Sequence, residues 1–288
     1  MDNIIQPVVL QTHTRSRFNQ RSQTIIYLSL AAAFLLAIAV SGTLAGELAI
    51  TTNFTQKNLL PHMVHPFGTD WLGRDMLART LKGLSISILI GLFASVISAL
   101  IAAVLGTAAA TLGKRVDTAI TWLVDLVMGI PHLLLLILIS FALGRGTVGV
   151  IVAVAISHWP TLTRVIRGEI LQLKEENYVK IAGKLGQSKI RIAAKHLVPH
   201  VFPQFLVGLI LLFPHAILHE AALTFLGFGL PPEQPGIGII LSESMKYLSL
   251  GMWWLALFPG LALLGTVLLF DLAGGSLRRI IAPHSAQD

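Results

Sequence analysis

The sequence contains no cysteine among its 288 residues, and only 12% of the residues are charged. The absence of cysteine excludes disulfide bonds, iron–sulfur clusters and thiolate metal sites. The shortage of charge excludes an ordinary soluble domain, in which about a quarter of the residues are charged. Hydrophobic residues make up 54% of the chain, and the mean hydropathy is +0.76. These values indicate an integral membrane protein.

Motifs for catalysis and phosphate binding are also missing. The sequence has no GxxxxGK[ST] phosphate loop, no His-Glu-x-x-His zinc motif and no nucleophile elbow. We therefore expect neither catalysis nor a cofactor bound by this chain, so any ATP and Mg²⁺ would bind to partner subunits. The net charge of +7 does not indicate nucleic-acid binding, because the basic residues lie in loops and do not alternate with exposed aromatic residues.

Long apolar stretches are abundant. A membrane-spanning helix needs about 20 mostly apolar residues. Six stretches meet this requirement: residues 25–45, 83–112, 118–143, 147–163, 201–227 and 252–274. They predict an all-α membrane protein with about six transmembrane helices. The first stretch also resembles a signal peptide, but it is long for one and follows a long N-terminal segment, so we interpret it as a helix.

The distribution of charge predicts the orientation, since Lys and Arg accumulate on the cytoplasmic side of membrane proteins. With both termini inside, fifteen of the 21 Lys and Arg residues fall in cytoplasmic segments. The expected organisation is a cytoplasmic tail (1–24), a first helix (25–45), an extracytoplasmic or interfacial segment (46–82), a helical core (83–274) with a cytoplasmic loop at 164–200, and a second cytoplasmic tail (275–288).

The loop at 164–200 combines eight of these basic residues with apolar residues at helical spacing. The spacing predicts two short amphipathic helices on either side of a turn at Gly186. Such helices either lie on the lipid surface or dock onto a cytoplasmic partner. Their apolar positions are Tyr178, Ile181, Ala182 and Leu185 in the first helix, and Ile190, Ala193, Ala194 and Leu197 in the second.

Several polar residues fall within the apolar stretches, where charged groups usually face a bundle interior or a cavity. His215 and His219 are four residues apart, and therefore on one face of a helix that Pro214 is expected to kink. Two imidazoles at this spacing either bind a metal ion transiently or pack between helices. The candidate substrate-passage residues are His215, His219, Glu220 and Asp125, and the two histidines are the candidate metal ligands.

Four ordered motifs resemble a known family. The segment Tyr178-Val-Lys-Ile-Ala-Gly-Lys-Leu-Gly186 is similar to the Glu-Ala-Ala loop of binding-protein-dependent ABC importer permeases. Residues 65–75, 220–229 and 254–278 resemble the dipeptide/oligopeptide/nickel branch, specifically its second, C-type permease. The resemblance spans residues 65–283. It departs from the family pattern at Lys180, where the family usually has Glu, and at Asp271, where it usually has Asn.

The resemblance implies a type I ABC importer permease fold in the cell inner membrane, with coupling helices in the cytoplasmic loop. Implied partners are a homologous second permease, two ATP-binding subunits, an extracytoplasmic substrate-binding protein and the lipid bilayer. The residues expected to contact the ATP-binding subunits are Tyr178, Ala182, Leu185, Gly186, Ile190 and His196.

The substrate is open between nickel and peptides. His215-x-x-x-His219 and Ile156-Ser-His-Trp159 are similar to nickel-type permeases, which favours nickel, free or chelated, over di- and oligopeptides. An ion-coupled secondary transporter with a proton relay through Asp125, Glu220 and Asp271 is an alternative that needs no docking loop. A membrane-anchored assembly protein is another, but it leaves Pro214 and the histidine pair unexplained.

Overall fold

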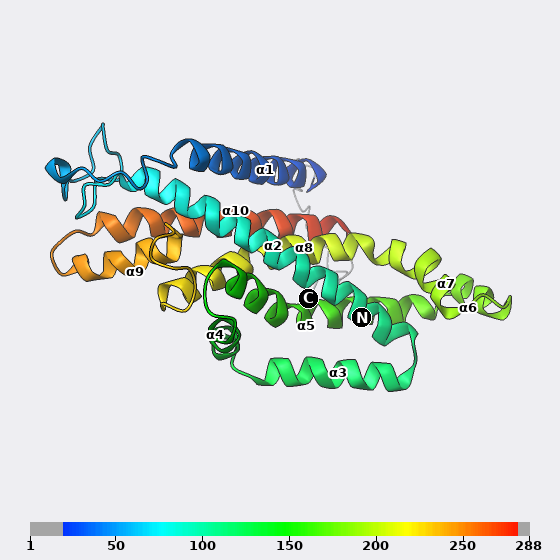
Figure 1. Ribbon diagram of the computed structural model, residues 1–288. Coiled ribbons are helices and arrows are strands. Elements are labelled where there is room, and N and C mark those ends of the chain that lie inside the picture. The colour runs from blue at the N-terminus through cyan, green and yellow to red at the C-terminus, as the bar shows by residue number, and fades with distance from the viewer. Residues whose placement is uncertain (1–19, 282–288) are drawn as a thin grey trace, which may run out of the picture.

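The computed structural model describes residues 20–281, and these residues form a bundle of helices without a β-strand (Figure 1). Most residues of the two expected tails lie outside this range. The helices are α1 (Gln20–Leu44), α2 (Met76–Thr111), α3 (Lys114–Gly129), α4 (His132–Ala142), α5 (Thr147–Lys174), α6 (Asn177–Lys184), α7 (Lys189–Ile192), α8 (Val198–Phe225), α9 (Ile237–Leu248) and α10 (Trp254–Ile281). A 3₁₀ turn, η1 (Phe54–Gln56), precedes α2, and a π-helical turn, η2 (Ala193–Leu197), joins α7 to α8.

Five helices are long and apolar enough to cross a membrane, and there are six spans if α3 and α4, which are bent by 96° at their break, count together as one. The predicted all-α architecture with about six spans is therefore confirmed. The stretch at 118–143 was expected to be one straight helix, but α3 ends at Gly129 and α4 begins after Pro131. Proline lacks a backbone N–H and keeps the residue before it out of the helical conformation, which accounts for the break.

The fourth span is longer than the sequence indicated. We expected it to end near Pro160, but α5 continues through this residue to Lys174, so the first part of the 164–200 loop belongs to a helix. Two arginines on this extension pair with α3: Arg167 binds both oxygens of Asp117 at 2.5 and 2.7 Å, and Arg164 binds Asp125 at 2.5 Å. These ion pairs join α3 to the C-terminal part of α5, a contact that the sequence did not predict.

Helix α2 lies at the centre of the bundle and packs against both α5 and α8. Its buried face is rich in small residues, among them Gly91, Ala94 and Ala99. Small side chains let neighbouring helix backbones approach closely, which is how membrane helices gain packing energy. A Cβ added at Gly91 would lie only 2.6 Å from Cγ1 of Ile217 on α8.

The two ends of the bundle differ (Figure 1). Helices α6 and α7 project at one end, here called the α6–α7 end, beyond the start of α1 and the last turn of α10, which lie on the same side of the molecule. The other end, here called the α9 end, carries α9 and the loop that connects α1 to α2. The orientation of the protein in the bilayer therefore depends on which of these two ends is cytoplasmic.

The motif at residues 65–75 fixes the α1–α2 loop to the α9 end. Asp70 is fully buried and accepts hydrogen bonds from Nε of Arg74 at 2.6 Å and from Nη1 of Arg79 at 2.8 Å. Arg79 in turn donates to Glu243 on α9 at 2.9 Å. This part of the family resemblance thus has a structural role. Since α2 starts at Met76, the last residues of the expected 46–82 segment are helical.

Candidate functional site

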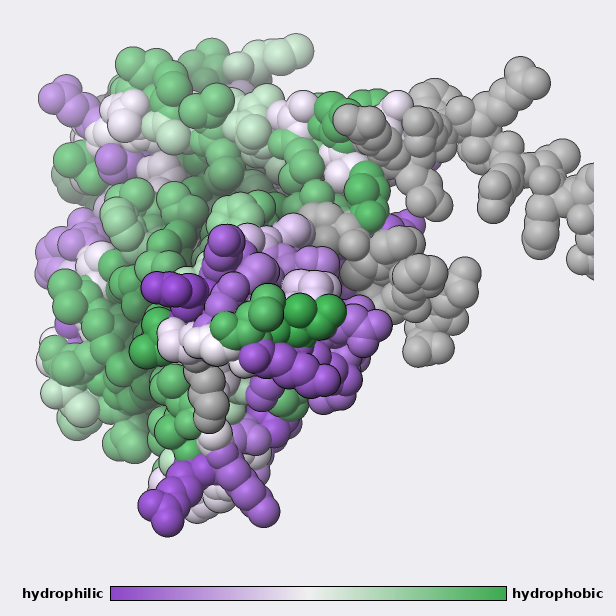
Figure 2. All heavy atoms as spheres, turned by 90° about the vertical axis from the view of Figure 1, so that its right-hand side faces the viewer, coloured by the Kyte–Doolittle hydropathy of each residue, from purple (hydrophilic) through white to green (hydrophobic). Residues whose placement is uncertain are grey.

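The turn between α6 and α7 presents an apolar surface at the tip of the molecule. Tyr178, Ile181, Leu185 and Ile190 are all exposed, and Leu185 and Ile190 keep 76% and 73% of their surface accessible. We call these four residues the tip surface. Seen from this end, an apolar strip is flanked by hydrophilic residues (Figure 2). A soluble exterior does not need such a strip, so it marks a surface for a partner or a membrane.

The opposite face of the same turn anchors it to the bundle. Val179 and Ala182 are both buried, and Val179 packs in the hydrophobic cluster that includes residues of α2, α5 and α8. Ala182, which we expected to contact a partner, therefore faces inward. His196, also on the expected contact list, is half-buried, with its ring centroid 6.1 Å from that of Tyr178. Alanine tolerates burial on an amphipathic helix, so its spacing alone could not distinguish the two faces.

Gly186 forms the turn that the sequence predicted. Its φ of +81° lies in the left-handed region, which glycine adopts without the steric penalty of a Cβ. The second helix differs from the expectation, because α7 is only four residues long and runs through the π-helical turn into α8. Motion of the tip would therefore be transmitted directly to a membrane span.

An ion pair connects the end of α5 to α6, just before this turn. Lys180, the residue found where the family usually has Glu, donates to Glu175 at 2.9 Å. This hydrogen bond holds the pKa of the exposed Glu175 carboxyl below its ordinary value. The pair therefore contributes at neutral pH and is lost as the pH falls through the lowered pKa. The family departure at Lys180 is thus partnered within the chain.

A cavity of about 660 Å³ lies between the α3–α4 break, α5 and α8. Three histidines from three helices meet in it: His132 at the start of α4, His158 on α5 and His219 on α8. Their ring centroids are 4.5–4.8 Å apart, and one nitrogen from each ring lies within 4.8 Å of the others. We call these residues the histidine triad.

Backbone carbonyls orient two of the rings. Nδ1 of His158 lies 2.9 Å from the carbonyl oxygen of Val154, and Nδ1 of His219 lies 2.8 Å from that of His215. A carbonyl only accepts hydrogen bonds, so these nitrogens carry the protons and donate. Nε2 of His158 is then left with a free lone pair. Nε2 of both His132 and His158 is buried without a hydrogen-bond partner.

The structure separates the residues predicted for substrate passage. His219 joins the triad, whereas His215 lines the cavity without belonging to the three-nitrogen group. Glu220 points elsewhere: it is fully buried and accepts a hydrogen bond from Thr224 at 2.9 Å. Asp125 is exposed and paired with Arg164. His132 and His158 were not among the predicted passage residues, because sequence spacing does not reveal that α4 and α5 bring them to His219.

The three carboxylates proposed as a proton relay for a secondary transporter do not form a connected chain either. Asp271 is exposed on α10, Glu220 is buried beside Thr224, and Asp125 pairs with Arg164. No hydrogen bond found among residues 20–281 connects any two of the three. Asp271 also forms no ion pair within the described residues, although Arg278 and Arg279 follow it on the same helix.

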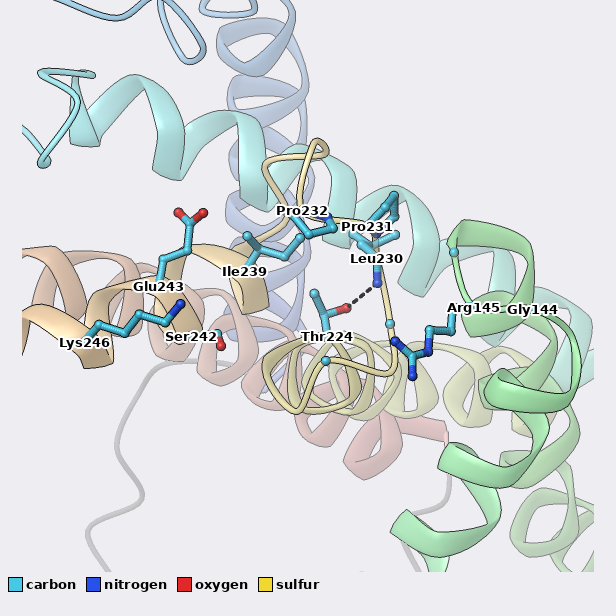
Figure 3. A pocket seen from close by; sticks show the side chains of 13 residues that line it. Gly144, Arg145, Thr224, Leu230, Pro231, Pro232, Ile239, Ser242, Glu243 and Lys246 are labelled. Atoms are coloured by element: carbon cyan, nitrogen blue, oxygen red, sulfur yellow. Dashed lines mark hydrogen bonds between the residues drawn. The ribbon is translucent and has the colours of Figure 1, made fainter.

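A second cavity, of about 630 Å³, opens at the α9 end (Figure 3). Arg145 lies on one side of it, and Glu243 and Lys246 lie on the other. The α4–α5 turn that carries Arg145 is tied to the α8–α9 loop, because Gly146 donates to the carbonyl of Gly229 at 3.0 Å. The Arg145 guanidinium stacks 5.4 Å from the ring centroid of Phe228. This cavity brings both signs of charge to the end of the bundle opposite the tip surface.

Several membrane-spanning helices around a histidine-lined cavity, with an exposed apolar strip at one end, fit the class of membrane transport subunits. Residues 102–284 match the family described as the binding-protein-dependent transport system inner membrane component, and the chain belongs to this family. It is therefore a permease subunit of an ABC importer and not an enzyme. Importers of this kind combine permeases with ATPase subunits and a substrate-binding protein.

Named relatives match most of the chain. A Brucella suis protein named as a peptide transport system permease is 37% identical over 96% of this chain and 92% of its own. The dipeptide transport system permease protein DppC of Bacillus subtilis is 33% identical over 87% of this chain and 78% of its own. The oligopeptide transport system permease protein OppC of the same organism is 36% identical over 81% and 76%. These names support the peptide branch and give no support to the nickel subgroup that the sequence motifs favoured.

Proposed function

We propose that this chain is one of two permease subunits of an ATP-driven importer of di- or oligopeptides. The observation that carries the substrate class is the near full-length similarity to permeases named for peptide transport. Peptides were the alternative in our sequence interpretation, and they now replace nickel as the main reading. The histidine triad is the feature that a simple peptide carrier does not require.

The α6–α7 end is, in this proposal, cytoplasmic, together with both chain termini. The excess of Lys and Arg in the 164–200 loop supports this orientation. The α9 end then faces the substrate-binding protein, and its mixed-charge cavity lies where cargo would be delivered. A homologous permease would complete the path, and lipid would cover the exposed apolar residues of helices such as α1.

The tip surface is the proposed contact with an ATPase subunit. Closure of the two ATPases on ATP would displace the α6–α7 turn. Because α7 continues into α8, and α5 leads into α6, the displacement would reach two membrane spans at once. The bundle would thereby shift between inward-facing and outward-facing states, an equilibrium biased by nucleotide.

Uptake by intact cells tests the substrate class. Cells with and without this gene are supplied with a radiolabelled dipeptide or with radiolabelled nickel. We expect deletion to abolish dipeptide uptake and plasmid-borne wild type to restore it. Normal dipeptide uptake combined with lost nickel uptake would reject peptides as the cargo, while leaving the importer architecture unaffected.

A further inference from the structure

We propose that the histidine triad is a binding site for a late first-row divalent metal ion, such as Ni²⁺, Cu²⁺ or Zn²⁺. The ligands are His132, His158 and His219, so the pair suggested by sequence spacing, His215 with His219, is replaced by a set from three helices. Metal binding at this site goes beyond the proposed peptide import and does not depend on it.

The distances carry the first step. Three imidazole nitrogens lie within 4.8 Å of one another. Ligands held about 2.0–2.1 Å from one tetrahedral metal are separated by roughly 3.3 Å. The triad is therefore slightly more open than an occupied site, and small side-chain rotations would bring the nitrogens into range.

The hydrogen bonds carry the second step. Metal-binding histidines usually donate their other ring N–H to a carbonyl or carboxylate, which fixes the tautomer and aims the free lone pair. His158 and His219 do this through Val154 and His215. Buried polar atoms almost always have a partner, yet Nε2 of His132 and His158 has none. A bound cation supplies the missing partner for both.

The composition of the cavity selects the class of ion. Neutral imidazole suits Ni²⁺, Cu²⁺ and Zn²⁺, whereas Mg²⁺ and Ca²⁺ prefer oxygen ligands. No carboxylate is among the residues that line the cavity. Three ligands leave at least one coordination position open, and His215 also lines the cavity. The volume of about 660 Å³ far exceeds that of one ion, so the metal has room to carry a bound peptide or other chelator.

Metal binding by the purified importer tests the proposal. The complete complex in nanodiscs is stripped with a chelator and titrated with Ni²⁺ and Co²⁺, with calorimetry and the visible Co²⁺ spectrum as readouts. We expect one ion per copy of this chain and a spectrum typical of nitrogen ligation. The double variant His132→Ala/His158→Ala should lose at least tenfold in affinity, whereas His200→Ala, an exposed histidine outside the cavity, should bind like wild type.

Equal binding by wild type and the double variant would overturn the proposal, as would absence of binding by wild type. If the double variant does not assemble, protection of wild-type histidines from diethylpyrocarbonate by Ni²⁺ decides instead. Protection of His132, His158 and His219 supports the site, and unchanged modification of all three rejects it.

Repeating the titration with an excess of the dipeptide Gly-His distinguishes a bare ion from a chelate. Weaker binding means that the dipeptide competes for a bare ion, and stronger binding means that the site accepts the complex. Either result supports a metal site. Dipeptide uptake is measured on the same proteins. Absence of metal binding with intact dipeptide uptake rejects the metal site and leaves the proposed function standing. Metal binding without dipeptide uptake rejects the proposed function and leaves the metal site standing.

Discussion

The Asp70 carboxylate has no accessible surface and neutralises Arg79, of which only 3% of the side chain is exposed. The substitution Asp70→Asn keeps the shape but removes the charge, which leaves Arg79 with Glu243 as its remaining carboxylate partner among residues 20–281. Loss of one partner from a buried ion pair costs about 3–5 kcal/mol. We expect a lower midpoint of thermal unfolding and faster proteolysis of the α1–α2 loop.

The exposed pair between Glu175 and Lys180 provides the control for this measurement. Glu175→Gln likewise removes the charge of one partner of an ion pair, but at the surface, where solvent screens the interaction. We expect no measurable shift in the unfolding midpoint at neutral pH. Equal destabilisation by the two substitutions would contradict the structural role assigned to the 65–75 motif.

Gly186 offers a second test at the residue scale, because a Cβ there would meet no other atom within 4 Å. Within this chain, the cost of Gly186→Ala thus arises from the positive φ, about 1–2 kcal/mol for an L-residue. Asn tolerates this conformation better, so Gly186→Asn should retain more peptide-stimulated ATPase activity than Gly186→Ala. Gly183→Ala, within α6, is the matched control and should behave like wild type. An equal loss of ATPase activity in all three variants would show that the positive φ of Gly186 is not the cause.

At the scale of helices, the contact between α2 and α8 depends on Gly91. Gly91→Ala would force Ile217 to move, and overpacking of this kind typically costs about 1–3 kcal/mol. Gly265→Ala on α10 adds the same methyl group into open space. We expect the first variant, and not the second, to lower the unfolding midpoint of the detergent-solubilised complex. A neutral Gly91→Ala would show that this helix contact is looser than described.

The tip surface provides the docking test. Leu185→Glu/Ile190→Glu places two charges on side chains that contribute little to folding, since both are largely exposed. We expect the permeases to assemble normally but to retain far less ATPase subunit on co-purification. Met63→Glu, which changes a 99% exposed residue at the α9 end, should leave that association intact. Unchanged association of the double variant would instead favour a lipid-facing role for the tip.

Sequence reasoning succeeded where apolar length and local spacing decide the structure. It predicted the membrane spans, the helix at Tyr178–Leu185 and the turn at Gly186. It failed where a local signal competes with tertiary packing. A helix ends before Pro131, whereas α5 continues through Pro160, which is buried in the bundle. Helix α9 was not predicted. The histidine triad could not be foreseen, because its members come from residues far apart in the chain.

For the whole molecule, the proposed function is ATP-driven import of peptides, with the transport cycle driven from the α6–α7 end. The alternative, a secondary transporter, would depend on an ion gradient and would not need the tip surface. The two differ in their energy source, and this difference can be measured without knowing the exact peptide. It also does not depend on whether the histidine triad binds metal.

The most direct measurement is uptake of a labelled dipeptide by proteoliposomes that contain the complete importer, its binding protein and a controlled supply of ATP, with an uncoupler present to abolish ion gradients. An importer driven by ATPase subunits at the tip surface should show uptake that requires ATP, persists with the uncoupler and falls to background in Leu185→Glu/Ile190→Glu. Uptake that continues without ATP and collapses with the uncoupler would contradict it.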